Sequence, residues 1–122
     1  MIAPSELRIG NYVLIGSLVW TPIDGILSSQ VFACNGVGIN YIDIDPIPIT
    51  PEWLERLGFE WDIYYQGYCD GNYLVNIREN GTISFAYGKR RHDEMQFLPY
   101  IKYVHQLQNL YHAITGNELK IK

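Results

Sequence analysis

The polar segment after residue 88 holds the densest group of charged side chains in the sequence. It contains the only basic cluster of a chain that has nine Lys and Arg against thirteen Asp and Glu: Lys89, Arg90, Arg91 and His92. Adjacent guanidinium groups hold phosphate through charge-assisted, bidentate hydrogen bonds. The cluster therefore predicts a site for a small anionic ligand such as a nucleotide. The other interpretation is an exposed loop whose positive charges are balanced by Asp93 and Glu94.

Tyrosines on the segments that flank this loop are candidates for the same site. Tyr64, Tyr65 and Tyr87 lie in strand-forming stretches, where alternate residues face opposite sides of a sheet. Rings that are not needed in the core could stack on a base or pack at a subunit interface. Cross-strand aromatic pairing within the fold explains them equally well.

A row of neutral polar residues marks one side of the last predicted helix. The spacing of His105, Gln108, Asn109 and His112 places all four on one face, away from the apolar stripe. Two interpretations stay open for this face. It is either a solvated surface that keeps an amphipathic helix soluble, or a row of hydrogen-bonding groups that meets a ligand or a partner.

Groups that could react are too scattered to predict an enzyme. His105 and His112 are too far apart in sequence for a helical zinc pair, and no third ligand is evident. Cys34 and Cys69 do not form a C-x-x-C pair and lie outside helix N-termini, so we expect free, buried thiols. The sequence has no phosphate-binding loop and no dinucleotide fingerprint. We therefore expect no catalytic residues, no metal and no cofactor.

The elements that must position these residues begin with a run of strands. Turn chemistry at Asn35-Gly36 predicts a hairpin, while Pro22 and Asp24-Gly25 are expected to interrupt the strands. The predicted strands cover 12–15, 17–20, 30–34 and 38–44. The first 45 residues thus predict a small, strongly bent antiparallel sheet or partial barrel.

A short helix is predicted after Thr50, which can cap it, with Pro51 in the first helical position and Gly58 at its end. Strands are then predicted over 59–65, 73–78 and 82–87, with a turn at 69–72. The last helix is predicted over 101–115, because apolar residues recur there at spacings of three and four. A short terminal strand is expected over 119–121. The fold class is therefore α+β, with one domain over 1–122.

Composition limits the partners. Hydrophobic residues make up 48% of the chain and charged residues 18%, which suffices for a folded core. The net charge of −4 argues against general binding to duplex nucleic acid, which usually needs a basic surface. The apolar runs are too short for a membrane span, and no signal peptide is recognised. We expect a cytoplasmic protein.

Three stretches of the sequence resemble a pattern found in a family of short proteins of Bacteroidota and of their phages and mobile elements. They are LRIGNYV from Leu7, IPITPEWL from Ile47, and HQLQNLY from His105 followed by TGNEL. The resemblance implies an intracellular protein, in the host cytoplasm if a phage encodes it. It supplies no catalytic residues.

These observations lead to two hypotheses. The first is a non-enzymatic, oligomeric binding protein that holds a small anionic ligand, for example a phage counter-defence protein that sequesters a nucleotide signal. The second is a structural or protein-interaction module without a small-molecule ligand. For the first hypothesis, ten residues are predicted to bind the ligand: Lys89, Arg90, Arg91, His92, Tyr64, Tyr65, Tyr87, His105, Gln108 and Asn109.

Overall fold

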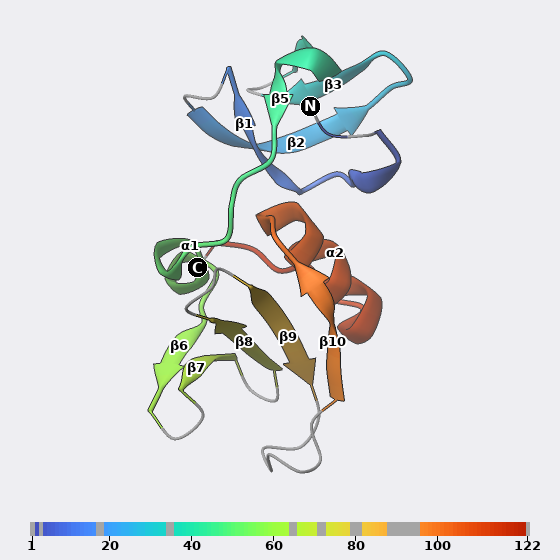
Figure 1. Cartoon of the computed structure of the whole chain (residues 1–122). Coiled ribbons are helices and arrows are strands. Elements are labelled where there is room, and N and C mark those ends of the chain that lie inside the picture. Colours follow the sequence, from blue (N-terminus) through green and yellow to red (C-terminus); the bar gives the residue numbers. More distant parts are fainter. Residues whose placement is uncertain are drawn as a thin grey trace. The chain divides into compact units, whose positions relative to one another are not determined.

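The computed structural model describes residues 2, 4–16, 19–33, 36–63, 66–70, 73–78, 82–87 and 96–121. These residues divide into two compact units. Unit 1 comprises Met1–Pro48 and Tyr103–Lys120, and unit 2 comprises Ile49–Lys102 and the last two residues. Each unit contains one five-stranded antiparallel sheet and one helix (Figure 1). The α+β prediction is confirmed, while the single domain over 1–122 stays a prediction.

The sheet of unit 1 is strongly curled, as the sequence predicted. Its strands lie in the order β4-β3-β2-β1-β5, so β5 returns beside the first strand and curls the sheet toward a half-barrel (Figure 1). The strands are β1 (Tyr12–Ile15), β2 (Val19–Ile26), β3 (Gln30–Ala33), β4 (Val37–Asn40) and β5 (Ile44–Asp45). Two short 3-10 turns, Pro4–Glu6 and Tyr41–Asp43, complete this part of unit 1.

The predicted interruption of the strands at Pro22 and Asp24-Gly25 is wrong. Strand β2 runs through all three residues, and its pairing with β3 shifts register between Ile23 and Gly25. A bulge of this kind absorbs residues that would otherwise end a strand, and it bends the sheet. The predicted hairpin is confirmed, since β3 and β4 pair from Ala33 and Val37 outward, with Gly36 at a φ of 94°.

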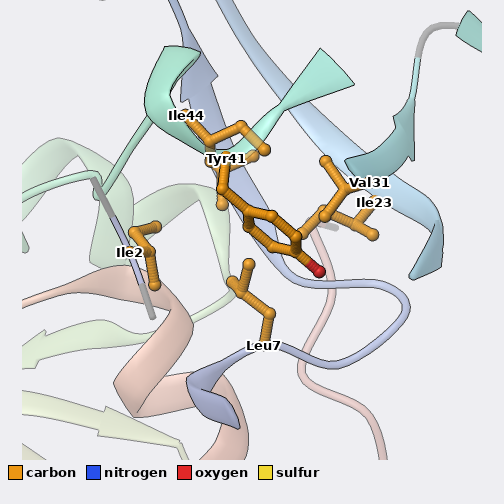
Figure 2. Packing of buried hydrophobic residues seen from close by; sticks show 7 residues of the cluster. Ile2, Leu7, Ile23, Val31, Tyr41 and Ile44 are labelled. Carbon is orange, nitrogen blue, oxygen red and sulfur yellow. The ribbon is translucent and has the colours of Figure 1, made fainter. Parts of the chain in front are cut away.

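The core of unit 1 lies inside this curled sheet. Figure 2 shows the ring of Tyr41 among aliphatic side chains that come from several strands and from the N-terminal segment. The Tyr41 hydroxyl donates a hydrogen bond of 2.6 Å to the Leu27 carbonyl, which satisfies the one polar group of this cluster. The buried residues of the core are Ile2, Leu7, Val13, Ile23, Val31, Tyr41 and Ile44.

Helix α2 (Val104–Thr115) also belongs to unit 1. It begins three residues later than predicted, because Ile101 ends a strand and Tyr103 bridges to Pro48. The Gln106 side chain accepts a hydrogen bond from the Tyr103 N–H at 3.1 Å and caps the first turn. Gly116 ends the helix in the left-handed conformation, at a φ of 76°. Residues 119–121, predicted as a strand, form no regular element.

Unit 2 is a meander of neighbouring antiparallel strands in the order β10-β9-β8-β7-β6. Helix α1 (Pro51–Arg56) precedes it and matches the sequence prediction, since the Thr50 side chain accepts a hydrogen bond from the Trp53 N–H. The strands are β6 (Glu60–Asp62), β7 (Gly67–Asp70), β8 (Tyr73–Ile77), β9 (Ile83–Tyr87) and β10 (Gln96–Ile101). Cys69 and Asp70, predicted to lie in a turn, are in β7. Cys69 is a buried thiol outside any disulfide, as expected, and packs with Leu74 and Ala86.

Candidate functional site

Part of the polar face of α2 is buried in the fold. Gln108 is 0% exposed and His105 is 1% exposed, while Asn109 is half-buried. The solvated-face interpretation is therefore wrong for His105 and Gln108. The apolar stripe on the neighbouring side is confirmed at Val104 and Leu107, which are both fully buried.

Gln108 is the centre of this face. Its Oε1 accepts a hydrogen bond of 2.9 Å from the Tyr12 N–H, at the start of β1. Its Nε2 donates to the Gly10 carbonyl at 3.1 Å and to the Leu119 carbonyl at 3.0 Å. One buried amide thus connects α2 to residues 10–12, near the start of the sequence, and to Leu119, just after the helix. Full hydrogen bonding is what makes a buried amide compatible with a core.

Two asparagines extend the network toward the N-terminal segment. Asn11, 0% exposed, donates to Asn109 Oδ1 at 2.9 Å and accepts the Arg8 N–H at 2.7 Å. Asn109 in turn donates to the Glu6 carbonyl at 2.7 Å. We call Asn11, Gln108 and Asn109 the amide cluster. Its hydrogen bonds hold residues 6–12 against α2, so these side chains have a structural role that the sequence did not reveal.

His105 differs from the amide cluster because its polar atoms are not satisfied. Its ring stacks on Tyr103, with centroids 6.0 Å apart and planes 9° apart. Within the described part of the chain, neither ring nitrogen has a hydrogen-bond partner. The Glu6 carboxylate lies 3.8 Å from Nε2, too far for a hydrogen bond. Burial lowers the pKa of His105, and the nearby Glu6 charge opposes this shift without cancelling it.

This lowered pKa predicts a fall in stability on acidification. The unfolded chain binds the His105 proton more readily than the folded chain, so the free energy of unfolding should decrease as the pH falls below about 6.5. His105→Phe keeps an aromatic ring on Tyr103 and removes both nitrogens, and it should flatten this dependence. The measurement is urea denaturation of parent and variant between pH 7.5 and pH 5.

The control for that experiment is His112→Gln, which alters the more exposed histidine of the same helix. His112 Nε2 lies 3.7 Å from the Glu118 carboxylate, and both side chains are substantially exposed. This variant should keep the fall in stability seen for the parent. An equal pH dependence in the parent and in His105→Phe would show that another group is responsible.

A surface ion pair lies beside the amide cluster. Arg8 Nη2 contacts both carboxylate oxygens of Glu118 at 3.0 Å. Both side chains are partly exposed, and exposed pairs of this kind contribute little to stability. We assign this pair no chemical role.

The basic loop lies outside the described residues. This applies to Lys89, Arg90, Arg91 and His92, and also to Tyr64 and Tyr65. Tyr87 ends strand β9, where its backbone is in register with Tyr73 and Gln96. Their shared binding site therefore stays a prediction. The structure places the other three predicted residues, His105, Gln108 and Asn109, within unit 1.

Within the ranges given above, no group of three or more His, Cys, Asp or Glu could hold a metal ion. No helix in the same ranges is long and apolar enough to cross a membrane. The exposed surface is more informative than the interior.

Large apolar side chains are exposed on unit 1, a feature that the sequence analysis missed. Three of them belong to a stretch from Gly25 to Ile42 that contains no Asp, Glu, Lys, Arg or His. Their exposed fractions are 53% for Leu27, 55% for Val37 and 73% for Ile42. We call this stretch the uncharged segment. The absence of charge over so many residues was the available signal in the sequence.

Comparison with known proteins gives no match to this chain among family models, curated proteins or solved structures.

Proposed function

We propose that the chain is a non-enzymatic binding protein that acts as a protein-interaction module through the surface of unit 1. The observation that supports this proposal is the uncharged segment, with its exposed Leu27, Val37 and Ile42. Exposed apolar residues favour association with another protein, because their burial removes apolar area from water.

The amide cluster also favours the protein-interaction module over the protein that binds a small ligand. A ligand site on α2 would need free donors and acceptors, but Gln108 and Asn109 already bond to Tyr12, Gly10 and Glu6. His105 is buried to 1% exposure. A ligand that bound Gln108 or Asn109 would have to replace hydrogen bonds that the fold already makes.

The competing proposal is a protein that sequesters a small anionic ligand, such as a nucleotide, in the suspected phage setting. The support for this proposal comes from the sequence alone. It is the pair Arg90 and Arg91, the only adjacent arginines in the chain. An acidic protein repels an anion unless fixed positive donors are provided. This proposal makes a prediction that distinguishes it from the interaction module.

Calorimetric titration and thermal shift against mono-, di- and cyclic nucleotides separate the two proposals. The interaction module should give no heat and no stabilisation, whereas a binder gains stability by mass action. If a nucleotide binds, Arg90→Ala together with Arg91→Ala should weaken it by about 1.5–3 kcal/mol for each charged hydrogen bond lost. Folding should change by less than about 1 kcal/mol.

The matched control removes two positive charges elsewhere, by Lys120→Ala together with Lys122→Ala. Both double variants have the same net charge. A difference in nucleotide binding between them therefore depends on where the removed charges lie and not on how many were removed. Nucleotide binding by the parent that is lost only in the arginine variant would overturn the interaction proposal in favour of the ligand proposal.

A further inference from the structure

The two sheets end in four edge strands among the described residues: β4 and β5 in unit 1, and β6 and β10 in unit 2. An edge strand presents unpaired N–H and C=O groups that can pair with another chain, and proteins usually block this with charge, proline, bulges or short strands. The four edges can therefore be compared for such protection.

Three of the edges are protected. Strand β5 has only two residues, includes Asp45 and is followed by Pro46. Strand β6 has a carboxylate at each end, Glu60 and Asp62. Strand β10 contains Pro99 and an irregularity in its pairing with β9. Each of these features disfavours the addition of another strand.

Strand β4 has none of these features. Its four residues, Val37, Gly38, Ile39 and Asn40, include no charge and no proline, and they pair with β3 in an unbroken register. All but the partly buried Ile39 are exposed. Alternate residues of an antiparallel strand direct their N–H and C=O groups to the side away from the existing partner. Strand β4 thus offers a regular, neutral edge.

The strand that pairs with β4 is neutral as well. Strand β3 behind it is also uncharged, and both strands lie within the uncharged segment. The exposed polar groups beside the edge are amides, since Gln30 Nε2 donates to Asn40 Oδ1 at 3.0 Å. Amides both donate and accept hydrogen bonds, so they can face identical groups without repulsion.

We propose that β4 pairs antiparallel with β4 of a second copy of this chain, joining two unit 1 sheets into one continuous sheet. The net charge of −4 makes two copies repel each other, and the uncharged segment offers a contact without opposed like charges. A two-fold contact buries the same surface on both copies and must be self-complementary, which an antiparallel pair of identical neutral strands satisfies. This inference rests on the proposed interaction function and names its partner.

The test compares two Val→Lys variants of the same sheet. Val37 and Val19 have similar exposed fractions, 55% and 59%, but Val37 is on the β4 edge, whereas Val19 begins β2 and pairs with Ile15 of β1. Sedimentation equilibrium from about 1 µM to about 1 mM covers the dissociation constants expected of a modest interface. The parent should approach twice the 14.1 kDa mass of the chain.

Val37→Lys should raise the dimer dissociation constant at least about tenfold, or about 1.4 kcal/mol, while Val19→Lys should change it much less. Hydrogen exchange provides a second measurement on the unmodified protein. Amide exchange within residues 37–40 should become slower as the parent concentration rises, because pairing protects the edge amides.

Three results would overturn the inference: a parent that stays monomeric throughout, equal effects of the two lysine variants, or concentration-dependent protection confined to other strands. None of them bears on the nucleotide titrations that test the proposed function. Conversely, a nucleotide-binding chain that also dimerises through β4 would overturn the proposed function and keep this inference.

Discussion

Replacing Gln108 with leucine should lower the free energy of unfolding by about 3 kcal/mol or more. Leucine has nearly the volume of glutamine but no amide, so the Tyr12 N–H and the carbonyls of Gly10 and Leu119 lose their partner. Each buried group left without a hydrogen bond costs about 1–3 kcal/mol. Urea denaturation of parent and variant at pH 7.5 measures the difference.

The matched control is Gln106→Leu, the same change two residues earlier in α2. Gln106 is half-buried, and its Oε1 accepts a hydrogen bond from the Tyr103 N–H at the helix start. Loss of a capping interaction costs about 0.5–2 kcal/mol. If both variants lost the same stability, helix formation rather than the amide cluster would explain the result for Gln108.

A third variant locates the lost stability. Asn11→Ala removes the side-chain hydrogen bonds of Asn11 with Asn109 and with the Arg8 N–H, but leaves the backbone bonds of Gln108 in place. Combined with Gln108→Leu, it should cost less than the sum of the two single changes, because neighbours in one hydrogen-bond network are coupled. Strict additivity would mean that the amide cluster does not act as one unit.

Local signals allowed parts of the fold to be predicted correctly. Helix α1 has its cap and its ending within one short stretch, from Thr50 to Gly58, and the structure uses both. The β3–β4 hairpin likewise depends on one turn. Such elements are determined by neighbouring residues, so a single sequence contains the information needed to find them.

The role of Gln108 could not be predicted in this way. Spacing correctly grouped it with His105 and Asn109 on one helix face, but its partners Gly10 and Tyr12 are almost the whole chain away. Periodicity shows which residues share a face and does not show what covers that face. A polar face covered by backbone groups therefore looks identical in sequence to a solvated one.

Strand β2 shows a second limit. Pro22 and Asp24-Gly25 are turn formers by local preference, and the structure keeps them within a strand because neighbouring strands pair on both sides of it. The bulge between Ile23 and Gly25 accommodates the conflict. Tertiary pairing that overrides local preference is not visible in a single sequence.

Leu107→Ala should lower the free energy of unfolding by about 2–5 kcal/mol, because it leaves a cavity in a packed interior. Leu107 is fully buried and is among the largest fully buried side chains of the described residues. Alanine is the better helix former of the two, so any loss of stability must come from packing and not from helix propensity. Urea denaturation with an unchanged slope would identify the loss as one of stability alone.

The matched control for this prediction is Leu110→Ala, the same substitution one turn further along α2. Leu110 is half-buried, so its truncation removes less buried surface and should cost clearly less stability.

Hydrogen exchange on Leu107→Ala adds a test of the prediction that the chain is a single domain. If residues 1–122 unfold as one domain, the slowest amides of unit 2 should lose as much protection as those of unit 1. Loss confined to unit 1 would show two separately folding units, and a variant as stable as the parent would contradict the assignment of Leu107 to the core.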